Sequence, residues 1–203
     1  MTRGQPEAQS AAPQLDVDAC RNLRPYTRKE YIARVLWALA GPLFRFSPRP
    51  LFGWRRFLLR CFGARVGAQA HVYPSTRIYL PWRLSLGAQA SIGEWALVYN
   101  LGEVVIGDRA TVSHRAHLCA GTHDHTSPEL PLIRARIEIG PQAWVCADAL
   151  VGPGVTVGAG AIVGAAAVAV RDVPAWTIVA GNPARPIKQR VLRAPSPAAS
   201  RTP

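Results

Sequence analysis

The sequence is poor in lysine, in acidic residues and in paired cysteines. Two of its 24 basic residues are lysines and only 12 residues are acidic, so the formal net charge is +12. This excess favours anionic partners such as phosphates, acidic glycans or a membrane surface. Net charge is the only feature of the sequence that would support nucleic-acid binding, so we predict no nucleic-acid partner. The cysteines lack metal-ligand spacing and are predicted to be reduced packing residues of a cytosolic protein: Cys20, Cys61, Cys119 and Cys146.

Long hydrophobic runs are absent as well. The longest, at residues 35–44, has half of the ~20 residues that a membrane-spanning helix needs, and it contains Gly41-Pro42. The N-terminus lacks the apolar stretch of a secretory signal peptide, so we expect a cytoplasmic protein. Residues 1–22 and 194–203 are rich in Ala, Pro, Ser and Gln and are predicted to be disordered tails.

Two helices are predicted in residues 23–63. Thr27 and Glu30 form a capping box that starts a helix over residues 28–40, ended by Gly41-Pro42. A second helix is predicted over residues 50–62. Its apolar stripe comprises Leu51, Trp54, Leu58 and Cys61, and its arginines mostly lie off that stripe: Arg55, Arg56 and Arg60. Such a helix can cap the open end of a repeat array, which we favour, or lie on an anionic membrane surface through residues 28–62.

An aliphatic residue recurs at every sixth position from Val66 onward. A small residue follows most of these after four positions, and a glycine often follows directly. The aliphatic positions are Val66, Val72, Ile78, Leu84, Leu86, Ile92, Val98, Val104, Ile106, Val112, Leu118, Ile139, Val145, Val151, Val157 and Val163. The small positions are Ala70, Thr76, Ala90, Ala96, Ala110, Ala116, Ala143, Ala149, Ala161 and Ala167.

A period of six describes a short strand and a turn, with the aliphatic residue inside and the small one at a narrow corner. We expect the glycine to supply turn dihedrals that a side chain would resist. An α-helix is excluded because six is not a multiple of ~3.6 and the glycines would be costly. The repeat predicts an all-β solenoid, a parallel β-helix of about five three-sided coils over residues 64–180.

The repeat is interrupted once. Other coil starts are 18 or 20 residues apart, but 33 positions separate Ile106 from Ile139. The excess predicts a loop over residues 119–136 that leaves one corner of the third coil. A repeat array tolerates such a loop, and loops on rigid scaffolds often carry function.

Several stretches resemble the hexapeptide-repeat acetyltransferases: the Ile/Val-Gly-x-x-Ala-x repeats, "GTHDHTSP", "VGPGVTVGAGAIVGA" and "RDVPAWTIVAGNPARPIKQR". Within that family, "YNLGEVVIG" and "PRPLFGWRRFLLRCFGARVG" are most similar to the colanic acid biosynthesis acetyltransferases. The resemblance implies a left-handed β-helix and a homotrimer with a groove between subunits. It also implies that acetyl-CoA, without a metal, acetylates a sugar or glycolipid acceptor there, in exopolysaccharide biosynthesis on the cytoplasmic side of the membrane.

The interrupted coil contains the candidate base. Acetyl transfer to a hydroxyl needs a group that removes its proton, and a neutral imidazole with a reference pKa of ~6.5 can do so near neutral pH. The resemblance assigns this role to His123, which stands where the related galactoside and maltose acetyltransferases have their base. His125 is secondary, His114 and His117 are expected to face outward, and His71 is assigned no role.

The resemblance also implies the acetyl-CoA contacts, with residues 181–193 as a CoA-binding exit segment. The predicted contacts are Trp144 over the thioester, Ala147 and Ala165 along pantetheine, and Arg171, Arg185 and Lys188 at the phosphates. Relatives often have a hydroxyl residue where this chain has Val170, which puts one hydrogen bond in doubt. Trp144 has an alternative role in trimer packing.

Asn100 and the pair Arg134 and Arg136 each have two possible interpretations. The Asn100 amide can bind acceptor hydroxyls, or it can be a structural ladder or turn residue. Arg134 and Arg136 can bind an acidic sugar or remain solvated.

Rival functions are less well supported. A zinc carbonic anhydrase-like hydrolase of this fold needs two ligands five residues apart, a separation that His114, His117, His123 and His125 do not offer. A non-catalytic scaffold or membrane adaptor would have no use for the exit segment. A serine O-acetyltransferase is a rival within the same class, but the loop and the N-terminal region of this chain resemble it less.

Overall fold

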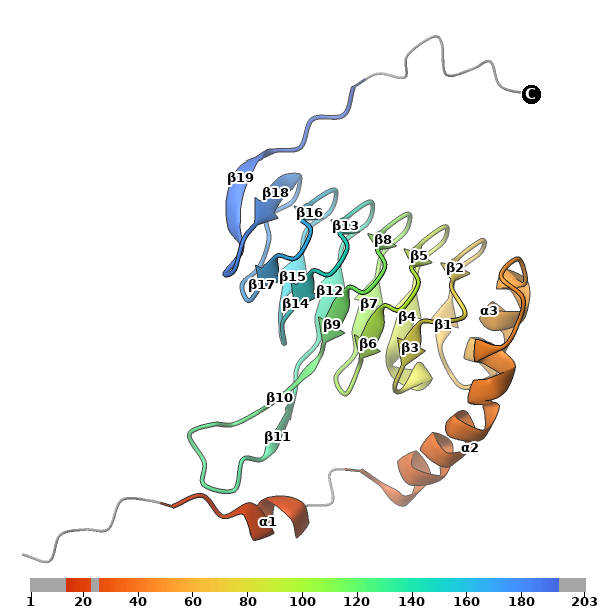
Figure 1. Ribbon diagram of the computed structural model, residues 1–203, viewed down its shortest axis with the longest axis vertical. Coiled ribbons are helices and arrows are strands. Elements are labelled where there is room, and N and C mark those ends of the chain that lie inside the picture. The colour runs from red at the N-terminus through yellow and green to blue at the C-terminus, as the bar shows by residue number, and fades with distance from the viewer. Residues whose placement is uncertain (1–13, 23–25, 194–203) are drawn as a thin grey trace, which may run out of the picture.

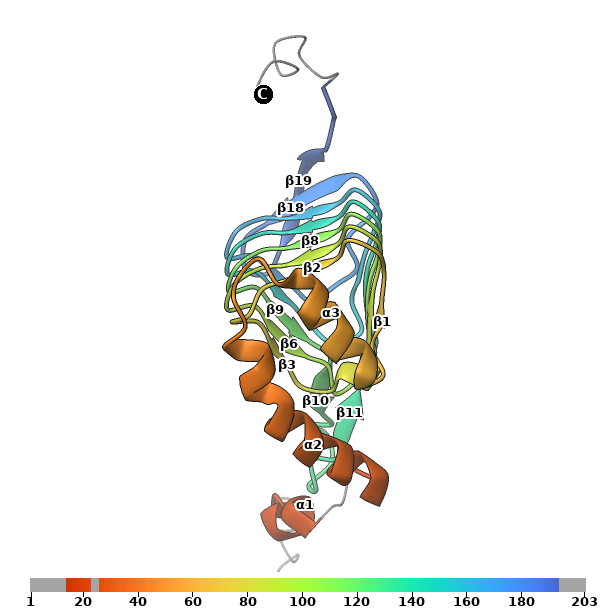
Figure 2. The same cartoon turned by 90° about the vertical axis from the view of Figure 1, so that its right-hand side faces the viewer.

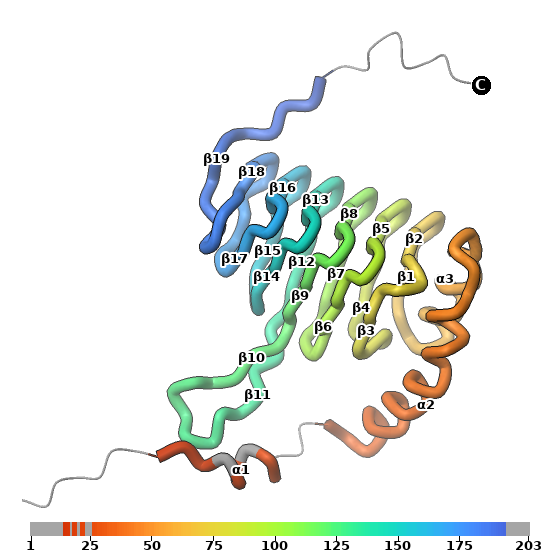
Figure 3. Tube along the Cα trace, in the orientation of Figure 1, coloured from red at the N-terminus to blue at the C-terminus, as the bar shows by residue number. Residues whose placement is uncertain are grey.

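The computed structural model describes residues 14–22 and 26–193. Its main body is a stack of coils built from short parallel strands, which follow one another along the stack in sequence order (Figures 1 and 3). Seen from the helical end, successive coils share one three-sided outline (Figure 2). The coils form a left-handed parallel β-helix, which confirms the predicted fold class.

Each side of the coil is one parallel sheet. The first consists of β1 (Arg65–Val66), β4 (Leu84–Leu86), β7 (Val104–Ile106), β12 (Ile137–Ile139) and β15 (Thr156–Val157). The second consists of β2 (His71–Val72), β5 (Ser91–Ile92), β8 (Thr111–Val112), β13 (Trp144–Val145), β16 (Ile162–Val163) and β18 (Thr177–Ala180). The third consists of β3 (Arg77–Ile78), β6 (Leu97–Tyr99), β9 (His117–Cys119), β14 (Leu150–Val151) and β17 (Val168–Ala169).

The coils stack in the predicted register. The five expected coil starts are strand partners in consecutive coils: Val66, Leu86, Ile106, Ile139 and Val157. A sixth coil begins at Val173, which bridges to Val157, and continues in β18. β19 (Arg185–Gln189) then turns back antiparallel to β18. A short 3-10 helix, η1 (Pro81–Arg83), forms the corner after β3.

The interior is the one that the six-residue period predicts. All sixteen aliphatic positions and all ten small positions are buried, none of them more than 9% exposed. Burial of one such aliphatic side chain is worth about 1.5–3 kcal/mol. The column of these residues along the stack therefore stabilises every coil through its neighbours.

The role expected for the repeat glycines is wrong. Positive φ occurs at corner positions three residues after the buried aliphatic residue, usually at other residue types such as Gln89 and Arg109, both at φ 57°. The glycines directly after the aliphatic residues serve close approach instead. A Cβ on Gly107 would lie 2.6 Å from the backbone nitrogen of Pro141 in the next coil. Coil spacing, and not turn conformation, selects glycine there.

Two helices, α2 (Arg28–Arg45) and α3 (Phe52–Cys61), cover one end of the stack (Figure 1). The capping box of Thr27 and Glu30 starts α2 as predicted. The predicted end at Gly41-Pro42 is wrong, because α2 continues for another turn. Phe44, in that turn, is buried and packs edge-on against Trp37. This packing supports a helix that proline alone would weaken.

The apolar stripe predicted for α3 is wrong as well. Trp54 and Cys61 are exposed, and the buried residues of α3 are Arg55, Leu58 and Leu59. Arg55 has no exposed surface. Its guanidinium donates hydrogen bonds to one hydroxyl and three backbone carbonyls: Ser47 Oγ (2.8 Å), Val72 O (2.5 Å), Pro48 O (2.9 Å) and Arg49 O (2.6 Å). These partners explain how a charged side chain can be buried.

The helices cap the open edge of the first coil. In every later coil, strand carbonyls accept hydrogen bonds from backbone amides of the preceding coil, as the Leu86 carbonyl does from the Gly67 amide. The first coil has no coil before it, so its carbonyls need other donors. Side chains of α2 and α3 supply them: Arg60 to Val66 O (3.0 Å), Arg56 to Ala70 O (3.0 Å), Arg55 to Val72 O (2.5 Å) and Trp37 to Ile78 O (2.8 Å). The cap that the sequence favoured is thus present.

The predicted loop is a projecting β-hairpin of β10 (Gly121–His123) and β11 (Leu132–Arg134) (Figure 1). Beside its tip lies α1 (Val17–Asn22), a helix inside the segment expected to be a disordered tail. The rest of both expected tails, residues 1–13 and 194–203, lies outside the described residues. The packing role predicted for the cysteines is wrong for Cys61, which is exposed, while the free thiols of Cys119 and Cys146 are half-buried. The side chain of Cys20 is outside the described part.

Candidate active site

His123 stands at the end of β10, where it pairs with Leu132 of β11 and is exposed. Its Nδ1 lies 2.5 Å from the backbone carbonyl oxygen of Leu130. A carbonyl oxygen only accepts hydrogen bonds, so Nδ1 must carry the proton in this contact. In the neutral ring, Nε2 then keeps its lone pair and is free to accept a proton. The hairpin thus selects the tautomer that a general base requires.

The hairpin is held at its base and at its tip. Glu30 of α2 forms a 2.6 Å ion pair with Arg83, and Arg134 of β11 lies 4.0 Å from the same carboxylate. The Thr27 amide, followed by Arg83, holds the pKa of Glu30 below its usual value. At the tip, the Asp16 amide donates to the Pro128 carbonyl at 2.9 Å. The N-terminal segment therefore anchors both ends of the hairpin that carries His123.

The two loop arginines have carboxylate neighbours within the chain. Arg134 approaches Glu30, and Arg136 pairs with Glu103 (3.1 Å) and Glu138 (3.2 Å). These contacts occupy the guanidinium groups that the sequence left open for an acidic sugar. We therefore leave both arginines out of the candidate acceptor site.

The other histidines have separate surroundings. His125 and His114 are exposed, and His71 stacks on Phe52 with ring centroids 4.2 Å apart. His117 faces outward as expected but is half-buried, and its Nε2 has no hydrogen-bond partner among the described residues. Burial lowers the pKa of His117.

Asn100 has no exposed surface. Its Oδ1 accepts from the Leu80 amide at 2.9 Å, and its Nδ2 donates to the Leu80 carbonyl at 2.6 Å. Both ends of the amide are thus used to join two coils at one corner. This is the structural alternative stated for Asn100, and acceptor binding by it forms no part of the function proposed below.

Two residues predicted to contact pantetheine lie on one corner of the coil. Ala147 and Ala165 each stand two positions after paired core residues of β13 and β16, and the Ala166 amide donates to the Ala147 carbonyl at 2.9 Å. One coil earlier the same corner position is His114, whose carbonyl accepts from Asp148. The corner therefore offers two small side chains in a row along the stack.

The remaining predicted CoA contacts surround the later coils. Trp144 is 44% exposed on the outer side of β13, and its Nε1 donates to Ser113 Oγ at 2.8 Å. The three cations predicted at the phosphates are exposed: Arg171 after β17, and Arg185 and Lys188 on β19. Val170, at the position that departs from the family pattern, is exposed as well.

The hairpin and the alanine corner belong to different edges of the prism. The hairpin leaves between β9 and β12, whereas Ala147 and Ala165 lie between the second and third sheets. One side of the coil has about six residues, so the two edges are separated by on the order of 15–20 Å. Figure 2 shows the hairpin leaving from the opposite side to β2 and β8. Within one chain, His123 does not face the alanine corner.

A polar hollow of about 450 Å³ continues from the alanine corner toward the first coil. It lies over β2, β5 and β8 and has three hydroxyl-bearing residues of those coils in its lining, together with a tyrosine, two imidazoles and an ion pair. The polar lining residues are Arg49, His71, Tyr73, Ser91, Glu94, Thr111, Ser113 and His114. Arg49 lies 3.6 Å from Glu94 and over the ring of Tyr73. The size and lining suit a small polyhydroxylated ligand.

Among residues 14–22 and 26–193, no three His, Cys, Asp or Glu side chains gather closely enough to hold a metal ion.

Comparison with known proteins identifies the family. No family model matches the chain. The chain is 41% identical over 155 residues to the "Putative colanic acid biosynthesis acetyltransferase WcaF" of Escherichia coli (strain K12), a match that covers 76% of this chain and 85% of that protein. The chain belongs to the hexapeptide-repeat acetyltransferase family.

Solved structures share the fold of this acetyltransferase. A galactoside acetyltransferase in complex with coenzyme A aligns with a TM-score of 0.75 and 22% identity, over 82% of this chain and 85% of that one. A maltose O-acetyltransferase from Clostridium difficile 630 aligns with a TM-score of 0.74 and 22% identity, over 82% and 90%. At this level of identity the similarity concerns the fold.

Sequence reasoning missed the parts of the acetyltransferase that position His123. The carbonyl of Leu130 is a backbone group and has no signal of its own in the sequence. Glu30, read as half of a capping box, also pairs with Arg83 and lies near Arg134. The only sign of these pairs in the sequence is that Glu30 and the arginines have opposite charges. Because the sequence has 22 arginines, charge alone does not identify the partners.

Proposed function

We propose that this acetyltransferase uses acetyl-CoA to acetylate a hydroxyl of a sugar or glycolipid in exopolysaccharide biosynthesis, with His123 as general base. The observation that carries the proposal is the contact from His123 Nδ1 to the Leu130 carbonyl, which leaves Nε2 free. The relative at 41% identity, described as a colanic acid biosynthesis acetyltransferase, supports the acceptor class.

The chemistry assigned to His123 is a proton relay. Acetyl-CoA, when bound, supplies a thioester carbonyl. Nε2 removes the proton of the acceptor hydroxyl while the hydroxyl oxygen forms a bond to the carbonyl carbon. The carbon–sulfur bond then breaks, and the imidazolium returns the proton to the thiolate of CoA. The Leu130 carbonyl holds the ring in place and stabilises the positive charge that forms on it.

The separation of the two edges supports a site shared between subunits. His123 and the alanine corner cannot meet in one chain, so we propose a homotrimer in which the hairpin of one subunit reaches the corner of the next. Pantetheine would lie along Ala147 and Ala165, and Trp144 would flank the thioester. At the far end of the groove, the CoA phosphates would meet the exposed cations Arg171, Arg185 and Lys188.

We assign the acceptor sugar to the polar hollow over β2, β5 and β8. It begins one coil from Ala147 on the same corner, and its hydroxyl, carboxylate and imidazole groups can donate to and accept from sugar hydroxyls. Glu94→Gln and Ser91→Ala should raise the KM for the acceptor while leaving the KM for acetyl-CoA unchanged. Unchanged acceptor KM in both variants would place the sugar elsewhere.

No helix among the described residues is long and apolar enough to cross a bilayer. We place the enzyme on the cytoplasmic side of the membrane, touching it through residues 28–62, where a lipid-linked acceptor would be within reach.

His123→Ala tests the proposal directly. The variant should keep its assembly state and its affinity for acetyl-CoA but lose about 10²–10⁴ in kcat, the usual worth of a general base. His125→Ala is the matched control, since His125 is exposed on the same loop, and it should cost much less. Turnover by His123→Ala close to that of the wild type, on an acceptor that the wild type uses well, would contradict the assigned base.

The cofactor contacts are tested with two thioesters. Replacing Arg171, Arg185 and Lys188 by Ala should raise the KM for acetyl-CoA more than the KM for an acetyl-pantetheine thioester, which lacks the nucleotide phosphates. Arg193→Ala, an exposed arginine of the same exit segment, serves as the control. Equal losses for both thioesters would assign these residues to structure.

Complementation tests the shared site. His123→Ala lacks the base, and Ala165→Trp should block the pantetheine corner, so each variant alone should be inactive. After the two are mixed and reassembled, about one site in four combines an intact corner with an intact His123 of a neighbour. Recovery of that activity supports the trimer groove. A monomeric mass by light scattering, or no recovery in confirmed mixed trimers, would overturn it.

A further inference from the structure

The outward side of α2 is apolar along its whole length. Six large side chains on this side are between 51% and 79% exposed: Ile32, Val35, Leu36, Leu39, Leu43 and, just after the helix, Phe46. At about 100° per residue they fall within an arc of about 100°. Trp37 and Phe44 lie on the inward side, where they pack toward α3 and the first coil. We call these six residues the outer stripe.

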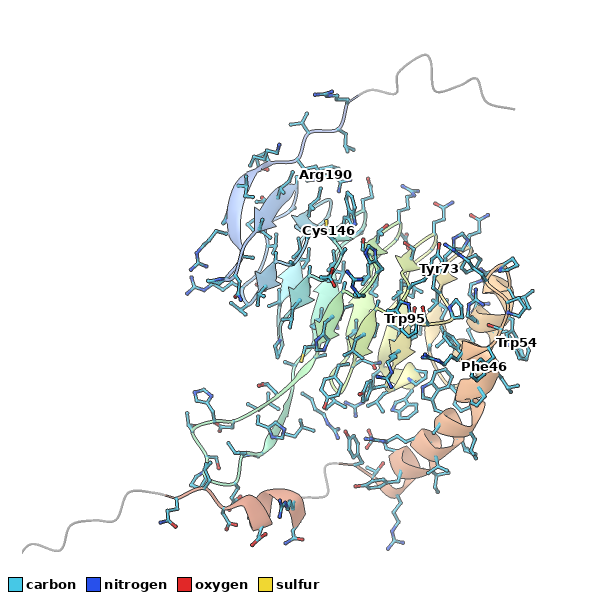
Figure 4. The ribbon with its side chains drawn as sticks, in the orientation of Figure 1. Phe46, Trp54, Tyr73, Trp95, Cys146 and Arg190 are labelled. Atoms are coloured by element: carbon cyan, nitrogen blue, oxygen red, sulfur yellow. The ribbon has the colours of Figure 1, made fainter. Side chains whose placement is uncertain are left out.

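The stripe continues onto α3. Trp54 is exposed, its Nε1 donates to the Leu43 carbonyl at 3.0 Å, and its ring stacks on the exposed Phe57. Between the two helices is a mostly apolar hollow of about 440 Å³ beside Pro42, Leu43 and Phe46. Figure 4 places Phe46 and Trp54 together at the helical end of the stack. The exposed apolar surface is thus one continuous patch, larger than isolated exposed residues account for.

The charges around the patch are of one sign. Residues 26–62 contain eight basic residues and a single acidic one, Glu30. Glu30 is turned inward to Arg83. The arginines of α3 are bonded to carbonyls of the first coil, so they do not form the rim. Exposed cations remain where α2 begins, Arg28 and Lys29, whereas the guanidinium of Arg45 at its end lies over the ring of Trp95 in the coils.

We infer that the outer stripe docks the enzyme on a bilayer of anionic phospholipids, with its apolar side chains at the boundary of the acyl chains and Arg28 and Lys29 at the headgroups. An exposed apolar face with a cationic rim is the pattern of an interfacial helix. This inference names the surface behind the membrane contact proposed above and does not depend on the acetyl-transfer chemistry.

The position of the stripe favours a membrane over a second copy of the chain. It lies on helices that cover one end of the stack, whereas the hairpin leaves from a side of the stack (Figures 1 and 2). The alanine corner stands at the edge between the second and third sheets. Subunits that meet side by side leave this end free. In the proposed trimer three stripes would face the same way, so one flat surface could engage all three and strengthen binding.

Vesicle flotation with the full chain tests the inference. The wild type should float with phosphatidylcholine vesicles that contain 30% phosphatidylglycerol, and much less with phosphatidylcholine alone. Leu39→Glu with Phe46→Glu should lower partitioning about 100-fold or more, because two inserted apolar groups are lost and two charges are added. Ile187→Glu with Val191→Glu is the matched control, since these residues are exposed apolar positions at the opposite end. It should change partitioning less than about twofold.

Arg28→Ala and Lys29→Ala should each weaken binding to the anionic vesicles about fivefold and reduce its salt dependence. Turnover of a water-soluble acceptor should be the same in the wild type and in the Leu39/Phe46, Arg28 and Lys29 variants, which shows that the fold and the site are intact. No flotation of the wild type, or flotation of the Leu39/Phe46 variant like the control, would overturn the inference. So would a loss of self-association in that variant without vesicle binding by the wild type, because the stripe would then contact another copy.

Discussion

The coils and the segments attached to them are built on different rules. In the coils, one inward pattern recurs and each residue contacts its counterpart one coil away, so that Leu86 relates to Ile106 as Val66 does to Leu86. In the helical cap and the hairpin each contact occurs once, as between Arg55 and Val72 or His123 and Leu130. The repeated contacts provide a rigid frame. The single contacts close its end and position its candidate chemistry.

The largest effect on stability is expected where a single contact supports the repeated part. Arg55→Met should lower the free energy of unfolding by roughly 3–4 kcal/mol, because the buried carbonyl of Val72 and the partly buried carbonyls of Pro48 and Arg49 lose their donor. Arg56→Met, with one bond to Ala70, should cost about 1 kcal/mol. Urea unfolding of both variants checks the difference. Equal costs would mean that the cap acts through packing alone.

Gly107→Ala tests spacing as the role of the repeat glycines. The new Cβ would meet backbone of the next coil, so the variant should lose about 2–3 kcal/mol. Gly154, at φ +79°, has no atom closer than 3.9 Å to such a Cβ, so Gly154→Ala should cost only about 1 kcal/mol through its backbone conformation. A larger cost at Gly154 than at Gly107 would restore turn conformation as the dominant requirement.

Glu30→Gln should loosen the hairpin more than the coils. Loss of the charge beside Arg83 and Arg134 is expected to cost about 1 kcal/mol. Because the pKa of Glu30 is lowered in the folded state, its contribution is present above its ordinary pKa of 4.5 and is lost as the pH falls below that value. Hydrogen exchange should quicken in residues 121–134 of the variant. Quickening spread evenly over the coils would contradict a local anchor.

The smallest effect concerns the half-buried His117. Burial lowers its pKa, so the unfolded chain binds a proton more readily as the pH falls below about 6.5, and stability should decline in that range. His117→Leu, which matches Leu97 and Leu150 in the same row, should flatten this decline by less than about 1 kcal/mol. Melting temperatures at pH 7.5 and pH 5.5 give the comparison. An identical decline in the variant would assign the pH dependence to other groups.

The frame could be predicted well because its period is local. Each aliphatic residue obeys the same six-residue rule, so coil starts, register and core could be derived from the sequence without knowing any distant contact. The hairpin was located for the same reason, as a step of 33 positions in a rhythm of 18 or 20. The start of α2 was also local, since Thr27 and Glu30 cap it within four residues.

What depended on distant groups could not be predicted. The sequence by itself determined the β-helix, its interior and the place of its interruption, because strand period, side-chain volume and capping act between near neighbours. The tertiary structure decided that Arg55 turns inward, that α2 runs past Pro42, that glycine serves coil spacing and that Asn100 joins two coils. It also decided the tautomer of His123, through a carbonyl seven residues away. In each case the deciding partner is a backbone group or a packed ring brought near by folding, and its position exists only once the coils have stacked.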